Sequence, residues 1–201
     1  MSGNLVNLSQ PGIAIPDPVV VDSNVVIAFF QAFFPGEHAQ QVDRASSFFR
    51  RLRAENQQAI LTPSAFSELL HVAVRNRYKL IVKDQRRVLT ARYGVPINTW
   101  VDLYKEDPTI LQDIGHNLAA LRQALVARNI VIAGAEDMRF ARYPSARPYA
   151  EELIDRMVRY GLDSSDTCIL LEAERLGVTS VVTMDRDIRR ALSDFDIYTW
   201  T

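Results

Sequence analysis

The chain of 201 residues has a single cysteine, almost no excess of either charge and no long apolar run. One cysteine excludes an internal disulfide framework and is typical of a reducing compartment. A formal net charge of −1 excludes attraction to nucleic acid by bulk positive charge alone. No stretch approaches the roughly 20 apolar residues that cross a bilayer, and the N-terminus lacks the pattern of a signal peptide. We therefore expect a cytoplasmic protein that does not enter a membrane.

Short apolar runs alternate with amphipathic stretches along most of the chain. Continuous apolar runs, as in strands buried on both faces of a parallel sheet, lie at 19–21, 59–61, 130–133, 180–183 and 197–200. Helical patterns are found at about 25–30, 39–53, 62 onward, 109–125, 149–160, 165–176 and 187–192. This alternation predicts a three-layer α/β/α fold with a mainly parallel central sheet. Residues 1–17 are polar and interrupted by prolines, so we expect an N-terminal extension that packs loosely.

Four acidic residues stand beside the predicted strand ends. Asp22 directly follows the first apolar run, and Asp185 closes the segment that begins at Ser180. Glu68 lies early in the helix that follows 59–61, and Asp166 lies in the first turn of another helix. Because ligands bind outside the carboxyl ends of the strands in an open parallel sheet, we expect these acids to meet at one edge.

Several carboxylates brought together repel one another unless a cation lies between them, and burying them without a partner is costly. Ligands that are all oxygen favour Mg²⁺ or Mn²⁺ over softer metals. Hydrolysis of a phosphodiester by water that a metal activates needs no nucleophilic side chain, and none is evident here. The sequence therefore predicts a metal-dependent enzyme that acts on phosphodiesters.

The order of these motifs resembles the PIN domain family, which holds metal-dependent ribonucleases and includes the VapC-type toxins of bacterial toxin–antitoxin pairs. The resemblance rests on Asp22-Ser23-Asn24 after a strand, on Glu68 in a helix, and on a final segment in which Asp166 opens a helix. That segment ends in Val-Thr-Met-Asp-Arg-Asp at 182–187, and the likeness covers roughly residues 19–200.

This resemblance implies a role for each matching residue. The metal-binding and catalytic acids are expected to be Asp22, Glu68, Asp166 and Asp185, with Mg²⁺ or Mn²⁺ as the cofactor. The expected supporting residues are Asn24 and Thr183. Two further acids, Asp163 and Asp187, are expected either to cap a helix or to bind a second ion.

The resemblance also suggests partners and a domain plan. An RNA substrate and an antitoxin protein are the expected partners. A homodimer is expected on separate grounds, since part of the aromatic run Phe29, Phe30, Phe33 and Phe34 can form a dimer surface instead of core. The nuclease domain is predicted to span 18–201, and the chain is longer than a compact toxin by a helical insertion around 78–125. Residues expected to hold an RNA backbone are Arg75, Arg77, Lys79, Arg139 and Arg142, with Tyr78, Tyr93 and Tyr143 placed to stack on unpaired bases.

Two alternatives remain open from the sequence. The fold can be kept as a catalytically silent scaffold that binds a partner. It can also belong to a structure-specific DNA nuclease, because acids and a metal do not by themselves read the 2′-hydroxyl that distinguishes RNA.

Overall fold

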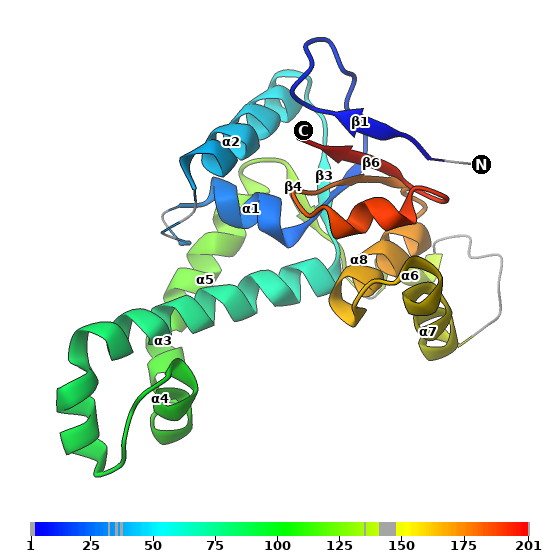
Figure 1. Ribbon diagram of the computed structural model, residues 1–201. Helices are drawn as coiled ribbons and strands as arrows, with labels where there is room; N and C mark the ends of the chain where they lie inside the picture. Colours follow the sequence, from blue (N-terminus) through cyan, green and yellow to red (C-terminus); the bar gives the residue numbers. More distant parts are fainter. Residues whose placement is uncertain are drawn as a thin grey trace.

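A parallel β-sheet forms the centre of the molecule (Figure 1). The computed structural model describes residues 3–31, 33–34, 36, 38–134, 136–140 and 148–200, and leaves the side chains of residues 113, 139 and 140 undescribed. In these ranges the six strands follow the order β1-β6-β5-β2-β3-β4, and every pair is parallel. Their bounds are β1 (Leu5–Asn7), β2 (Val19–Val21), β3 (Ala59–Leu61), β4 (Ile130–Ile132), β5 (Ser180–Val182) and β6 (Asp196–Thr199).

Helices cover the sheet on both faces, which confirms the predicted three-layer α/β/α fold. They are α1 (Ser23–Phe29), α2 (Ala39–Ala54), α3 (Pro63–Tyr93), α4 (Trp100–Glu106), α5 (Ile110–Val126), α6 (Asp137–Phe140), α7 (Tyr149–Tyr160) and α8 (Ser164–Arg175), with a 3₁₀ helix η1 (Asp187–Ala191). Every residue of β2 and β5 is buried, as the apolar residues Val19–Val21, Val181 and Val182 predict for strands covered on both faces. The register aligns Val20 of β2 with Val181 of β5 and Ile60 of β3.

The chain changes direction across the sheet between β2 and β5. From β2 it proceeds outward to β3 and β4, then returns to the other side of β2 to form β5 and β6. Neighbouring strands whose connections leave in opposite directions create a crevice at their carboxyl ends, where open α/β sheets bind ligands. Asp22 follows β2 directly, and Thr183 follows β5 directly. The topology therefore brings the two strand ends together at the switch point of the sheet.

The N-terminal segment belongs to the sheet, so the expectation that residues 1–17 pack loosely is wrong. Strand β1 pairs with β6, aligning Leu5 with Ile197. Leu8 and Ile15 are buried in the main core. Pairing with a strand from the far end of the chain is a long-range contact, and the polar, proline-interrupted local sequence gives no sign of it.

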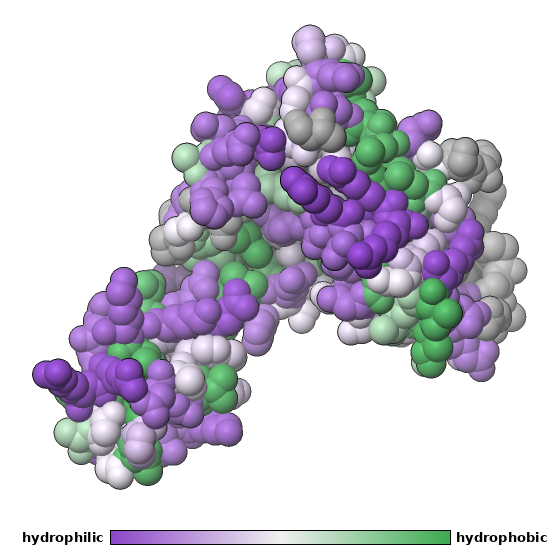
Figure 2. Space-filling view, in the orientation of Figure 1, coloured by the Kyte–Doolittle hydropathy of each residue, from purple (hydrophilic) through white to green (hydrophobic). Residues whose placement is uncertain are grey.

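A helical arm, which we define as residues 74–118, extends from the body (Figures 1 and 2). It contains most of α3, all of α4 and the first half of α5. A second hydrophobic cluster fills it, centred on Tyr78, Val82, Leu103 and Ile114. Helix α4 lies within the helical insertion expected around 78–125 but was not predicted as a separate helix, and Thr99 and Asp102 form a capping box at its N-terminus.

No helix in the described ranges is both long enough and apolar enough to cross a membrane.

Candidate functional site

Asp22 lies at the point where β2 ends and α1 begins, with only 2% of its surface exposed. Two donors reach the same carboxylate oxygen. Thr183 Oγ1 donates to Oδ2 over 2.6 Å, and Asn24 Nδ2 donates to the same atom over 2.6 Å. The second oxygen, Oδ1, lies 3.3 Å from Ser23 Oγ. Asp22 is therefore a rigidly held carboxylate at the switch point.

Thr183 and Asn24 also link the ends of β2 and β5. Thr183 Oγ1 accepts the backbone N–H of Asp185 over 2.9 Å, which sets the turn that carries this acid. Asn24 Oδ1 accepts the N–H of Met184 over 3.1 Å. Both side chains thus contact Asp22 and the segment before Asp185, the positions in which the sequence predicted supporting residues.

Glu68 reaches the same edge from the second turn of α3, the helix that follows β3. The Ser23 hydroxyl donates to Glu68 Oε2 over 2.9 Å, so Ser23 lies between Glu68 and Asp22. Thr62 caps α3 by accepting the N–H of Ala65, and Pro63 occupies its first turn, as expected from Thr62-Pro63.

Glu172 fixes α3 against α8 and was missed in the sequence. It is buried, and its two oxygens accept the N–H and the hydroxyl of Ser64 over 2.9 and 2.7 Å. This carboxylate satisfies donors at the N-terminus of α3 from the middle of α8, and so sets the relative position of the helices that carry Glu68 and Asp166. A signal was present, since Glu172 interrupts the apolar run Ile169-Leu170-Leu171 and Ala173.

Asp166 lies in the first turn of α8 and is partly exposed. Asp163 is the N-cap of this helix, and its Oδ1 accepts the N–H of Asp166 over 3.0 Å. Burial raises the pKa of Asp166, and the negative charges of Asp22, Asp163, Asp185 and Glu68 add to the shift, which brings this pKa to about 7. The four acids predicted from the sequence are thus close enough to act on one another electrostatically.

The pKa of Asp22 is also raised by burial and by the neighbouring acids. Burial raises it from 3.8 to about 6, against the hydrogen bonds from Thr183 and Asn24, which lower it. The charges of Glu68 and Asp185 add to the upward shift. We call Asp22, Glu68, Asp166 and Asp185 the acid cluster. Across the described ranges, no arginine or lysine forms an ion pair with any of the four.

The chemistry of the acid cluster fits a hard divalent cation. All its donors are carboxylate oxygens, and their mutual repulsion is the condition that a cation relieves. As the side chains lie, no three His, Cys, Asp or Glu groups among the described residues are placed to hold a metal ion together. A hard cation such as Mg²⁺ keeps several of its waters and needs only one or two carboxylates as direct ligands.

Two shallow hollows open beside the acid cluster. One contains Glu68 and His71 of α3 together with Ser164, Ser165 and Cys168 of α8. The other contains Asn24, Asp185 and Asp187. Asp187 is exposed and pairs with Arg190 over 2.8 Å, so it differs from the acid cluster in having a cationic partner.

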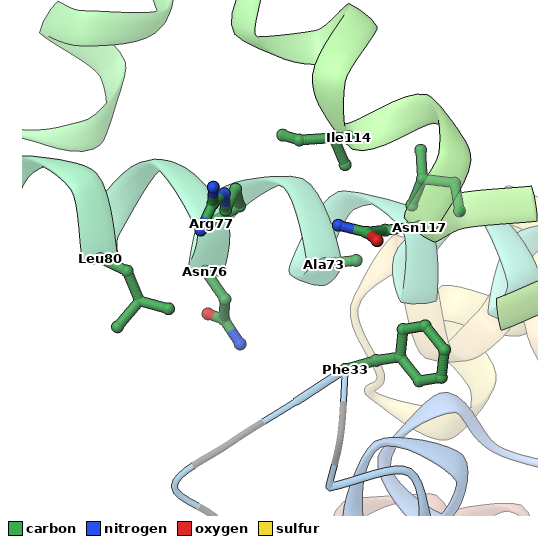
Figure 3. A pocket seen from close by; sticks show the side chains of 8 residues that line it. Phe33, Ala73, Asn76, Arg77, Leu80, Ile114 and Asn117 are labelled. Atoms are coloured by element: carbon green, nitrogen blue, oxygen red, sulfur yellow. The ribbon is translucent and has the colours of Figure 1, made fainter. Parts of the chain in front are cut away.

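The basic residues predicted to hold RNA do not line one common pocket in the described part of the chain. Arg77 lines a pocket between α3 and α5 that also contains Phe33, Asn76 and Asn117 (Figure 3). Lys79 lines a separate groove with residues of α4. Arg75 is half-buried, and its Nε has no hydrogen-bond partner. Arg142 and the side chain of Arg139 lie outside the described residues.

The aromatic residues expected to stack on bases do not form one surface. Tyr78 is fully buried in the core of the arm, so the expectation that it stacks on a base is wrong. Tyr93 donates its hydroxyl to Asp107 over 2.6 Å. Tyr143 lies outside the described residues.

Comparison with protein-family models gives no match for this chain, and comparison with curated protein sequences gives none either. The resemblance to the PIN domain family accordingly stays a prediction from the sequence.

Proposed function

We propose that this protein is a nuclease dependent on Mg²⁺ or Mn²⁺ that hydrolyses RNA phosphodiester bonds. The observation that carries the proposal is the acid cluster at the switch point of the sheet. Its central member, Asp22, is buried with a raised pKa, and its neighbours in the described ranges bring further negative charge instead of an arginine or lysine. Keeping such a cluster costs stability unless a cation compensates it.

Asp22, Glu68, Asp166 and Asp185 would hold the metal. When bound, Mg²⁺ or Mn²⁺ lowers the pKa of a coordinated water and neutralises charge on the phosphate and the leaving oxygen. The chain's own contribution is positioning. Thr183 and Asn24 hold Asp22, Ser23 holds Glu68, and the N-cap Asp163 supports the turn that presents Asp166.

The test is cleavage of labelled single-stranded RNA and DNA of the same sequence, with Mn²⁺, with Mg²⁺ or with EDTA. We expect RNA cleavage that EDTA abolishes and that Asp22→Asn lowers by at least about 100-fold, since losing even a group that supports a metal ligand costs 10–100-fold. Asp194→Asn is the matched control, because this acid also lies at the end of a hydrogen-bonded network but is paired with arginines.

Three results would contradict the proposal. Full metal-dependent activity in Asp22→Asn would exclude the acid cluster as the site. No cleavage of either polymer, by folded protein that calorimetry shows does not bind Mn²⁺, would favour a silent scaffold. Cleavage of DNA alone would instead support the structure-specific DNA nuclease.

The toxin role and the antitoxin partner rest on the sequence resemblance alone, and the homodimer rests on the aromatic residues of 29–34. Growth arrest on expression of the wild type, absent with Asp22→Asn, would support a toxin. Light scattering of the purified protein would measure its oligomeric state.

A further inference from the structure

The helical arm carries a basic groove away from the acid cluster. Lys79, Lys83 and Arg86 of α3 line it together with Asn98 and Trp100, which lie before and at the start of α4. Its volume is about 560 Å³, and its lining includes no acidic residue. The buried Val82 forms an apolar part of the wall. The groove thus combines three cations, an amide and an indole.

Parts of this groove are held in place. Arg86 donates to the side-chain oxygen of Asn98, which ties α3 to the loop before α4. Trp100 is half-buried and packs on the second hydrophobic cluster while its remaining surface lines the groove. Neither Lys79 nor Lys83 is engaged in an ion pair within the described chain. Their ammonium groups are exposed and available to an anion.

The groove lies along the same face of α3 as Glu68 of the acid cluster. Steps of three or four residues lead from Glu68 to His71, Arg75, Lys79 and Lys83, and residues at this spacing share a helix face. The ring of His71, which lines the hollow beside Glu68, meets the ring of Trp100 edge-on with centroids 5.7 Å apart. The two aromatic rings therefore stand where the acidic hollow ends and the basic groove begins.

We infer that this groove binds single-stranded nucleic acid, with phosphates on Lys79, Lys83 and Arg86 and a base stacked on Trp100. The inference rests on the proposed nuclease function and adds the path that the substrate takes. Cations that face no acid match a phosphate backbone. An aromatic face beside them takes an unpaired base of any sequence. A duplex has its bases stacked inside and cannot offer one to Trp100.

The spacing sets a minimum length for the ligand. Lys79 lies about three turns beyond Glu68, about 16 Å along a helix. At roughly 3.4 Å per nucleotide in a stacked strand, this distance takes about five nucleotides. A strand of 12 nucleotides can therefore reach both the acid cluster and the groove, whereas a trinucleotide cannot.

The test measures the binding of a labelled 12-nucleotide strand in EDTA at several salt concentrations. Removing one cation that binds a phosphate should reduce the slope of log affinity against log salt by about 0.7, so we expect Lys83→Gln with Arg86→Gln to reduce it by about 1.4. Arg50→Gln with Arg53→Gln removes the same charge from exposed positions on α2 and is the control. Equal slopes for the two double variants would overturn the inference.

Tryptophan emission tests the stacking without disturbing the arm. Trp100 and Trp200 are the two tryptophans of the chain, and Trp200 is buried. In Trp200→Phe, the strand should quench Trp100 emission to saturation, and the duplex of the same sequence should not. Binding without any change in emission, or the same quenching by the duplex, would overturn the assignment of a single strand.

The experiments distinguish a failure of the groove proposal from a failure of the nuclease proposal. Binding is measured without metal, so a failure of the nuclease proposal leaves its outcome unaffected and appears only as missing cleavage with Mn²⁺. If the nuclease proposal holds and the groove does not, cleavage of the 12-nucleotide strand will be equal in the wild type and in Lys83→Gln with Arg86→Gln. We expect the variant to cleave the 12-nucleotide strand at least about fivefold more slowly at low concentration, and a trinucleotide at the same rate.

Discussion

Two regions of this molecule treat partly buried carboxylates in opposite ways. Between α7 and the turn before β6, Asp194 receives the hydroxyl of Tyr160 and the guanidinium groups of Arg156 and Arg159, at 3.4 and 3.0 Å for the arginines. Burial tends to raise the pKa of Asp194, but the hydrogen bonds from Tyr160 and Ser193 and the arginine charges hold it below its usual value. At the switch point, Asp22 is more deeply buried and its pKa rises to about 6.

This difference bears on the proposed role of the acid cluster. The chain neutralises Asp194 with its own arginines, and that region contributes to stability. At Asp22 the nearest charges are those of Glu68 and Asp185, which have the same sign. The fold supplies arginines to Asp194 and, within the described residues, no cation to the four members of the acid cluster, and this contrast supports the proposal that a cation from solution binds there.

The largest expected effect is the response to metal. A ligand at 100 times its Kd stabilises the folded protein by about 2.7 kcal/mol, so saturating Mn²⁺ should raise the Tm of the wild type by several degrees. Asp194→Asn should respond to the same extent, and Asp22→Asn should respond little. Differential scanning fluorimetry with and without Mn²⁺ measures all three. An equal shift in all three proteins would show that the metal binds elsewhere.

The next effect is on the free energy of unfolding without metal, which the two substitutions should change in opposite directions. We expect Asp194→Asn to lower the free energy of unfolding by about 1–3 kcal/mol, because it weakens hydrogen bonds to a charged group. Asp22→Asn should raise it by about 1–3 kcal/mol at pH 7.5, because the substitution removes a buried charge. Both donors to Asp22 reach one oxygen, which asparagine retains. Urea unfolding in EDTA tests this, and destabilisation by both substitutions would refute the contrast.

The stability changes caused by Asp22→Asn and Asp194→Asn should depend differently on pH. The pKa of Asp22 is about 6 in the folded state against 3.8 in the unfolded state, so its cost is absent below about pH 4 and grows as the pH rises to 6. The stabilisation by Asp22→Asn should therefore fade as the pH falls from 7 to 4.5.

Asp194 behaves in the opposite sense. Its folded pKa lies below 3.8, so its contribution is present above the unfolded pKa and is lost only as the pH falls through the folded value. The destabilisation by Asp194→Asn should thus stay constant from pH 7 to 5. Urea titrations at pH 7, 6, 5 and 4.5 measure both trends, and parallel trends for the two variants would contradict the assignments.

Sequence patterns predicted the sheet and the position of the acid cluster because both depend on local rules. The buried runs that become β2 and β5 are unbroken, and an acid at the end of such a run must lie at the strand's carboxyl edge. Glu172 was missed because its role depends on a contact with Ser64 across two helices, which no local pattern encodes. Strand β1 was missed for the same reason, since its three residues are ordered by pairing with β6 at the other end of the chain.

The basic groove on the arm shows a further limit of prediction from sequence. The sequence predicted Arg77 and Lys79 as one basic group, but residues two apart on a helix point about 160° apart, and the fold places the two on different surfaces. Trp100 joins Lys79 because α4, which begins at the capping box of Thr99 and Asp102, packs back against α3. The composition of a surface thus depended on a helix of seven residues, α4, which is too short to show a periodic pattern.

The smallest expected effect concerns Asp187, which lies next to the acid cluster in sequence but resembles Asp194 in having a cationic partner. Its pair with Arg190 is more than half exposed on both sides, and an exposed pair contributes little to stability. We expect Asp187→Asn to change cleavage by less than about threefold and the free energy of unfolding by less than about 0.5 kcal/mol. A loss as large as that of Asp22→Asn would place Asp187 among the metal ligands. In that case Arg190 would have to give up its partner when the metal binds, and the presence of an ion pair would no longer separate structural acids from catalytic ones.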